Sequence, residues 1–240
     1  MTSFVFIHGA LHGAWCWQRV VAALQNAGHS AAAINLPGRD GTTQPVLSDY
    51  VRVVADAVAA APSPVILVAH SLGGIAAGEY IATYPGAVKA LVLVNALLAW
   101  DGRSALQQIQ SAGEDCVFMR PGALAFSADG TTVAVNHRHA MAGFYNLCTP
   151  EDARDAAAQL CAEPIAPLSQ PMDLSANAFS AVPTVYLGSR EDRVLPWWLQ
   201  LQIAATTSAE LIELGGDHSP FLSVPGELLA ELTRIQKLFT

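Results

Sequence analysis

Ser71 lies where an apolar run of residues meets a segment of small ones. The run 65–68 leads into Ala69-His70-Ser71-Leu72-Gly73, and small residues continue to Gly78. This order is typical of a strand, a tight turn and a helix, with the serine at the turn. The turn strains the backbone of the serine, so its neighbours must be small. The segment therefore predicts a nucleophile elbow that exposes Ser71 Oγ, and an ordinary serine helix cap is the alternative.

An acid and a histidine follow Ser71 in the chain, each just beyond an expected strand. Asp192 follows the buried run 184–187, and His218 follows the run 210–214. The carboxyl ends of parallel strands meet at one edge of a sheet, so we expect the three side chains to lie together. In a triad of this kind the histidine is the base, and the carboxylate orients it.

Three other acids compete with Asp192 for the orienting role. Asp101 lies beyond the fourth expected strand and is the main alternative, because this architecture can also supply an acid from that loop. Glu191 is adjacent to Asp192 and is expected to point away from it. Asp217 is a weak candidate, because consecutive side chains in a turn rarely face each other.

Two backbone N–H groups are candidates for binding an oxyanion. The first expected strand runs into a glycine-bearing loop that can turn the Ala10 N–H inward, and the Leu72 N–H follows the nucleophile. Two such donors stabilise the transition state of acyl transfer. We interpret His8, His12 and His70 as buried structural residues of these two loops.

Three motifs carry a resemblance to a known family. The segments His8-Gly9-Ala10-Leu11-His12-Gly13-Ala14-Trp15-Cys16-Trp17, Ala69-His70-Ser71-Leu72-Gly73-Gly74 and Asp217-His218-Ser219-Pro220-Phe221-Leu222-Ser223 resemble those of the small α/β-hydrolases of the plant methylesterase and hydroxynitrile lyase family, including its bacterial relatives. The resemblance implies an α/β-hydrolase fold and a cap over the active site. In the lyase branch, threonine and lysine usually stand where this chain has Ala10 and Ser219. The resemblance is therefore to the esterase branch.

The composition favours one enzyme domain of the α/β class. The chain has 240 residues, of which 52% are hydrophobic and 13% charged, and its net charge is −8 without a basic cluster. These values disfavour nucleic-acid binding. No apolar stretch is long enough for a membrane span, and the chain leads directly into a strand without a signal peptide, so we expect a cytoplasmic protein. Low surface charge is compatible with a homodimer. The four cysteines form no CxxC pair, and neither a metal site nor a cofactor is indicated.

Alternating apolar and helical patterns predict a six-stranded, mostly parallel sheet with helices on both faces and a small inserted cap. We assign residues 1–99 and 179–240 to the core and 100–178 to the cap, all within one structural domain. The expected strands span residues 4–7, 30–35, 65–69, 90–95, 184–187 and 210–214, and the expected helices span residues 14–27, 48–60, 72–83, 196–205 and 224–239.

The substrate pocket is expected between the core and the cap, and its roof is expected to be apolar. The candidate lining residues are Leu11, Phe118, Met119, Leu124, Phe126, Phe144, Tyr145 and Leu147.

These observations predict a serine hydrolase that cleaves carboxylic esters of small, largely apolar substrates without a cofactor. Ser71 attacks the ester, His218 is the base and Asp192 orients it. Three alternatives use the same fold: cleavage of carbon–carbon bonds by a hydroxynitrile lyase or hydrolase, a cofactor-free oxygenase, and a slow-turnover ligand receptor.

Overall fold

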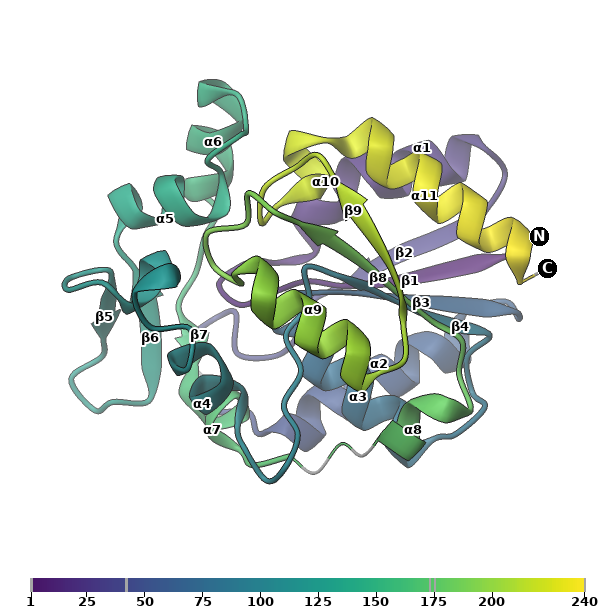
Figure 1. The fold of residues 1–240 in the computed structure, drawn as a ribbon, viewed down its shortest axis with the longest axis horizontal. Helices are drawn as coiled ribbons and strands as arrows, with labels where there is room; N and C mark the ends of the chain where they lie inside the picture. Colours follow the sequence, from purple (N-terminus) through teal and green to yellow (C-terminus); the bar gives the residue numbers. More distant parts are fainter. Residues whose placement is uncertain (1, 42, 173, 175, 240) are drawn as a thin grey trace.

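A six-stranded parallel sheet forms the centre of the computed structural model, which describes residues 2–41, 43–172, 174 and 176–239 (Figure 1). Every neighbouring pair of strands in the sheet is parallel. This arrangement confirms the predicted fold class. In spatial order the strands are β2 (Ser30–Ile34), β1 (Ser3–Ile7), β3 (Val65–His70), β4 (Ala90–Val94), β8 (Thr184–Ser189) and β9 (Glu210–Leu214).

Burial of the strands follows their position in the sheet. The four central strands are buried along their whole length, and three of them read as nearly continuous apolar runs. The edge strands β2 and β9 mix buried and exposed positions. Central parallel strands need apolar side chains on both faces because helices cover both, and this is why they could be identified from the sequence.

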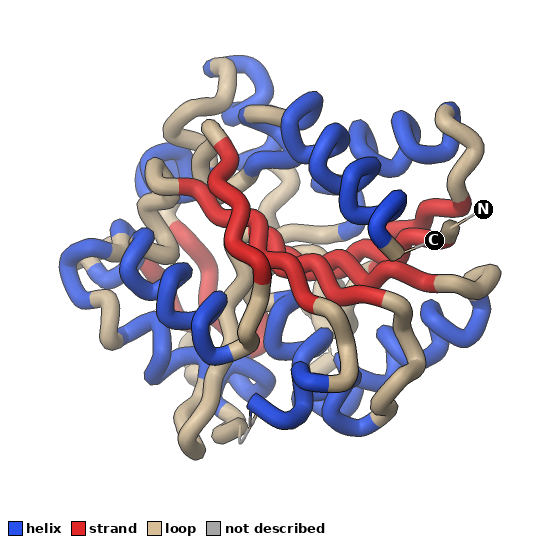
Figure 2. Tube along the Cα trace, turned by 45° about the vertical axis from the view of Figure 1, so that its right-hand side comes forward, coloured by secondary structure: helices blue, strands red, loops and turns tan. Residues whose placement is uncertain are grey.

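Helices cover the two faces of the sheet in two layers (Figure 2). One face packs against α1 and α11 around Phe6 and Trp17, and the other packs against α2, α3 and α9 around Tyr50 and Leu67. The covering elements are the 3₁₀ helix η1 (Ala14–Trp17), α1 (Gln18–Asn26), α2 (Leu47–Ala60), α3 (Gly73–Thr83), α9 (Trp197–Thr206), α10 (Pro220–Ser223) and α11 (Pro225–Leu238).

The predicted helix starts differ from those in the structure by one residue or by one 3₁₀ turn. The predicted helix 14–27 begins with one 3₁₀ turn before α1. The helix expected at 48–60 begins one residue earlier and follows Val46, whose N–H donates to Asp49 Oδ2 at 3.0 Å. The Asp49 carboxylate therefore closes the start of α2, and Ser48 lies inside its first turn.

The elements between β4 and β8 form an insert. They are α4 (Ala105–Gln110), η2 (Gly113–Asp115), η3 (Val117–Met119), β5 (Leu124–Phe126), β6 (Thr132–Val135), α5 (His137–Phe144), α6 (Pro150–Ala157), β7 (Glu163–Pro164), α7 (Ile165–Ser169) and α8 (Ala176–Ser180). Strands β5, β6 and β7 form a small antiparallel sheet. Most of the insert lies beyond the carboxyl ends of the central strands, away from both chain ends (Figure 1). Helix α8 instead packs against α3 of the core.

Helices of the described part of the chain are too short or too polar to span a membrane. The four cysteine thiols, at positions 16, 116, 148 and 161, are free.

Candidate active site

Ser71 occupies a strained turn between β3 and α3. Its φ angle is 48°, in the left-handed region, and its N–H donates to Val94 O at 3.3 Å. A Cβ atom on Gly73 would lie 2.8 Å from His8 O, and one on Gly74 would lie 2.5 Å from Leu97 O. Glycine is therefore required at both positions. The turn has the geometry of a nucleophile elbow, as the sequence predicts.

His218 and Asp192 are paired in the structure. His218 Nδ1 lies 2.8 Å from Asp192 Oδ2, and both side chains are fully buried. Asp192 Oδ1 accepts hydrogen bonds from the N–H groups of Val194 (2.7 Å) and Leu195 (2.9 Å). A carboxylate only accepts, so His218 donates its Nδ1–H and leaves Nε2 as the basic nitrogen. Within the described residues, Nε2 has no hydrogen-bond partner.

The loop that carries His218 is held from several sides. Asn95 Nδ2 donates to Asp217 O at 2.7 Å, and His70 Nε2 donates to His218 O at 2.8 Å. The His218 ring stacks on Phe144 of the insert with a centroid distance of 5.4 Å. These contacts fix the imidazole between the core and the insert. They also give His70 the structural position that we expect for it.

The three alternative acids, Asp217, Asp101 and Glu191, do not contact the His218 ring nitrogen that Asp192 binds. Asp217 Oδ1 accepts from the Ser219 N–H at 3.0 Å, and Oδ2 accepts from the Leu147 N–H at 2.8 Å. Asp101 and Glu191 are exposed, whereas the His218 side chain is buried with Nδ1 on Asp192. The geometry therefore favours Asp192 as the carboxylate that orients His218.

The N–H groups of Ala10 and Leu72 are available to a ligand. Neither N–H has a hydrogen-bond partner among the residues that the structure describes. Both residues line the same cavity as Ser71. Leu72 lies at the start of α3, where the helix leaves N–H groups unpaired. The two donors are therefore placed at the cavity wall that also presents Ser71.

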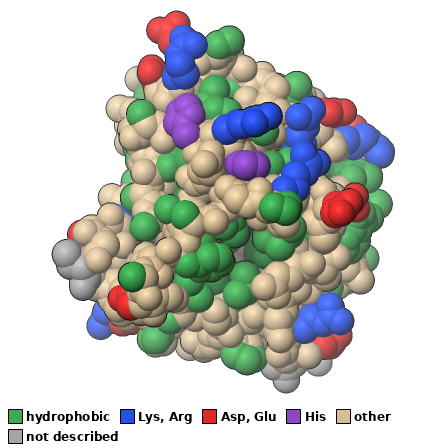
Figure 3. All heavy atoms as spheres, turned by 90° about the vertical axis from the view of Figure 1, so that its left-hand side faces the viewer, with side chains coloured by type: hydrophobic (Ala, Val, Ile, Leu, Met, Phe, Trp, Pro, Cys, Tyr) green, Lys and Arg blue, Asp and Glu red, His purple; other side chains and the backbone are tan. Residues whose placement is uncertain are grey.

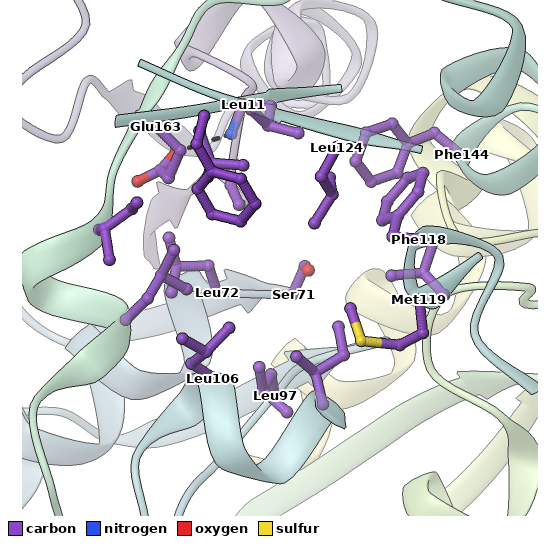
Figure 4. A pocket seen from close by; sticks show the side chains of 17 residues that line it. Leu11, Ser71, Leu72, Leu97, Leu106, Phe118, Met119, Leu124, Phe144 and Glu163 are labelled. Atoms are coloured by element: carbon purple, nitrogen blue, oxygen red, sulfur yellow. Dashed lines mark hydrogen bonds between the residues drawn. The ribbon is translucent and has the colours of Figure 1, made fainter. Parts of the chain in front are cut away.

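A cavity of about 100 Å³ lies over Ser71. Ser71 Oγ points into it, and the other labelled side chains are arranged around it (Figure 4). Of the 17 lining residues, the side chains of Ser71 and Glu163 are polar and the others are apolar. Phe126 lines the cavity and is 63% exposed, so the cavity reaches the surface near β5. Figure 3 shows hydrophobic side chains gathered around a hollow on this face.

The insert contributes much of the cavity wall. Of the candidate pocket residues, Leu11, Phe118, Met119, Leu124, Phe126 and Phe144 line the cavity. Sequence reasoning missed the aliphatic part of the wall, which is formed by Leu97, Leu106, Ile109, Val133, Ile165, Leu168 and Val194. These residues come from five separate segments, and no local pattern distinguishes them from core residues.

Tyr145 and Leu147 do not line the cavity, so their expected place in the pocket is corrected. Tyr145 is buried, and its OH donates to His12 Nε2 at 2.9 Å. Leu147 is 47% exposed, and its N–H is bonded to Asp217. Both residues follow Phe144, the last residue of α5, and their contacts are with the loops of His12 and Asp217 instead of with the cavity.

Comparisons with known proteins agree with this geometry. The alpha/beta hydrolase family matches residues 4–232. The chain is 31% identical over 258 residues to the probable esterase PIR7A of Oryza sativa subsp. indica, covering 97% of this chain and 95% of the relative. It is 27% identical over 249 residues to the putative methylesterase 11, chloroplastic, of Arabidopsis thaliana, covering 97% of this chain and 64% of that protein. The chain belongs to the α/β-hydrolase family.

The structure of tomato methylketone synthase I complexed with 2-tridecanone superposes on this hydrolase with a TM-score of 0.86. The two are 24% identical, and the match covers 100% of this chain and 99% of the other. This similarity supports the fold. The family and the esterase relatives confirm the predicted class, a hydrolase of the esterase type.

Three histidines of the hydrolase are buried close to the site. Burial lowers the pKa of His8 and of His12 to about 3, and it lowers the pKa of His70 well below the usual value. All three are therefore neutral at physiological pH. His12 Nδ1 donates to Ala10 O at 2.9 Å, and His8 Nε2 accepts from the Leu36 N–H at 3.0 Å.

A buried ionic cluster lies at the far side of the cavity, and sequence reasoning missed it. Glu163 Oε2 lies 2.7 Å from Arg39 Nη2, and Tyr50 OH donates to Glu163 Oε1 at 2.8 Å. Burial is the largest single effect on Arg39 and lowers its pKa, but the charge of Glu163, its hydrogen bond and the neighbouring Tyr50 and Cys161 together leave the pKa raised. Burial and the same charge raise the pKa of Tyr50. Because the three residues are distant in sequence, only their contact in the fold reveals the cluster.

The buried histidines predict a loss of stability in acid. Their pKa values are depressed in the folded state, so the unfolded chain binds more protons once the pH falls below about 6.5. Each histidine then lowers the free energy of unfolding by about 1.4 kcal/mol per pH unit down to its folded pKa. Urea unfolding measured from neutral pH to pH values near 4 is expected to show this loss. Replacing His8 with glutamine should make the slope shallower, and replacing the exposed His137 should leave it unchanged. A stability independent of pH over this range would contradict the burial of neutral histidines.

Proposed function

We propose that this hydrolase cleaves small, neutral carboxylic esters through an acyl-enzyme formed on Ser71. The observation that carries the proposal is the buried His218–Asp192 pair at 2.8 Å, whose Nε2 has no partner among the described residues. It is joined to the strained Ser71 turn (φ 48°) by the hydrogen bond from His70 to His218 O at 2.8 Å. This combination of base and nucleophile is the one that acyl transfer requires.

In the first half of the reaction, His218 Nε2 takes the Ser71 Oγ proton as Oγ attacks the ester carbonyl carbon. The carbonyl oxygen becomes an oxyanion and accepts hydrogen bonds from the Ala10 and Leu72 N–H groups. Asp192 holds the imidazole and stabilises its cation. The imidazolium then protonates the alkoxide as the carbon–oxygen bond breaks, and the alcohol leaves.

In the second half of the reaction, His218 removes a proton from water, and the hydroxide attacks the acyl carbon. The second oxyanion forms in the same place as the first. When it collapses, the bond to Ser71 Oγ breaks and His218 returns the proton to Oγ. The acid is released, and the enzyme is unchanged.

The cavity supports a small apolar substrate without a charge near the reacting carbon. Its volume is about 100 Å³, and apart from Ser71 its one polar side chain, Glu163, is already paired with Arg39. Burying an unpaired carboxylate costs several kcal/mol. The esterase and methylesterase names of the relatives further support methyl or other short alkyl esters.

We expect this preference to appear in a panel of three compounds: the methyl ester of a small apolar acid, the half-ester of a dicarboxylic acid, and mandelonitrile. The neutral ester should be hydrolysed over many turnovers, and the half-ester should have a kcat/KM about 10²-fold lower, because its carboxylate loses water in the cavity. Mandelonitrile should decompose no faster than in buffer. The Ala10 methyl group cannot hydrogen-bond to its hydroxyl, and the neutral Ser219 cannot stabilise departing cyanide as an ammonium could.

Initial rates at equal enzyme concentration, with buffer blanks at each pH, distinguish these cases. Cyanide release at a rate comparable to ester hydrolysis would overturn the assignment in favour of a lyase. Product formation that stops after one equivalent would indicate a receptor with slow turnover instead of an esterase.

A further inference from the structure

The Ala10–Leu11 peptide group is held at both of its polar atoms by side chains. Its carbonyl, Ala10 O, accepts from His12 Nδ1 at 2.9 Å, and its N–H, on Leu11, donates to Glu163 Oε2 at 2.7 Å (Figure 4). Leu11 has a φ angle of 67° and is buried. This left-handed conformation is unfavourable for a residue with a Cβ atom, so the surrounding contacts must maintain it.

Glu163 reaches the loop from the insert. It lies in β7, 152 residues after Leu11, and is 1% exposed. Arg39 Nη2 and Tyr50 OH fix its two oxygens at 2.7 and 2.8 Å. The carboxylate therefore has a fixed position from which it accepts the Leu11 N–H.

The insert also holds the carbonyl side of the same peptide group, through Tyr145 and His12. A carbonyl oxygen only accepts, so His12 donates from Nδ1 to Ala10 O and accepts at Nε2. Tyr145 OH donates a hydrogen bond to His12 Nε2 at 2.9 Å. Tyr145 thereby selects the tautomer of His12 that can hold Ala10 O.

The preceding peptide group carries the Ala10 N–H itself. Its carbonyl, Gly9 O, accepts from His8 Nδ1 at 2.8 Å and from the His12 N–H at 3.4 Å. In a trans peptide the C=O and N–H point in opposite directions. The hydrogen bonds to Gly9 O hold this carbonyl away from the cavity, so the Ala10 N–H is directed toward the cavity. This orientation is kept only while the next peptide group, Ala10–Leu11, cannot rotate.

We propose that Glu163 and Tyr145, both supplied by the insert, are positioning residues that fix the oxyanion-binding Ala10 N–H through the Ala10–Leu11 peptide group. The inference rests on the proposed esterase function, in which Ala10 N–H binds the oxyanion. Neither side chain touches the reacting atoms. Their effect is on the transition state, because the oxyanion needs this donor more than the bound ester does.

Three variants test the proposal. Glu163→Leu removes the acceptor for the Leu11 N–H and should lower kcat about 10²-fold with little change in KM. Glu163→Gln keeps an oxygen that can accept this N–H while its amide faces Tyr50, so it should recover most of the activity. Tyr145→Phe removes the proton donor to His12 and should lower kcat about tenfold. The matched control is Glu213→Leu, which removes a 48% exposed carboxylate paired with Arg190 and should have wild-type kinetics.

The second readout is binding of an alkyl boronic acid, which forms a tetrahedral adduct with the serine, compared with binding of the product acid. In Glu163→Leu and Tyr145→Phe the boronic acid should bind more weakly by the same factor as kcat/KM, while the product acid binds as in the wild type. Equal weakening of both ligands, or wild-type kinetics in Tyr145→Phe and in folded Glu163→Leu, would overturn the proposal.

A Ser71→Ala sample measured in parallel tests the proposed function separately. If it keeps the wild-type rate, the esterase mechanism fails. The contact itself can still be examined by hydrogen exchange of the Leu11 amide. If Glu163 accepts the Leu11 N–H, this amide is protected in the wild type and in Glu163→Gln and unprotected in Glu163→Leu. Absence of protection in the wild type would overturn the proposed role of Glu163, whatever the activity of the enzyme.

Discussion

Replacing Ser71 with alanine is expected to lower ester turnover on the order of 10⁶-fold, because the variant loses the nucleophile and cannot form the acyl-enzyme. The residual rate would come from the Ala10 and Leu72 donors and from substrate binding. Initial rates with the neutral methyl ester measure the effect. Circular dichroism and thermal unfolding should show that the fold is retained, since the lost hydroxyl points into the cavity.

Ser71→Gly is the matched control for backbone strain. Glycine adopts a φ of 48° without penalty, whereas alanine does not. If the loss of activity comes from the missing hydroxyl, both variants should be equally inactive. A glycine variant that keeps substantial activity would show that the backbone of the turn, and not the hydroxyl, is what catalysis requires.

Replacing Asp192 with asparagine is expected to lower turnover about 10⁴-fold. The N–H groups of Val194 and Leu195 both point at Oδ1 and will select the amide oxygen of asparagine there. The amide NH₂ then faces His218 Nδ1 and donates to it. His218 must consequently carry its proton on Nε2, where it can no longer accept the proton of Ser71.

The control for Asp192→Asn is Asp101→Asn. Asp101 is the alternative acid suggested by the sequence, and it is exposed. Its substitution should change kcat/KM by less than about twofold, in line with the small effects of most surface substitutions. The opposite ranking of the two variants would move the acid to the loop after β4 and contradict the arrangement described here.

The elements that follow from local sequence were predictable. Apolar runs identified the central strands, and the small residues around Ser71 identified its turn, because both depend on neighbours in the chain. The start of α2 was predicted one residue too late, because it is set by the hydrogen bond from the Val46 N–H to Asp49, which the sequence pattern does not show.

The parts of the site that depend on distant contacts were not predictable. Glu163 appears in the sequence as one charged residue in an irregular segment, yet it meets Leu11 and Tyr50 across more than 100 positions. Tyr145 was expected in the pocket as one of the residues of the apolar roof. Its hydroxyl instead pairs with His12, which no periodicity in the sequence indicates.

The most direct test of the central claim is to identify the residue that a fluorophosphonate modifies. The reagent reacts with an activated serine and leaves a stable adduct, which peptide mass spectrometry can locate. We predict one adduct per chain, on the peptide that contains Ser71, formed in step with loss of esterase activity and absent from Ser71→Ala. An adduct on another residue, or no adduct while ester hydrolysis continues, would contradict the account.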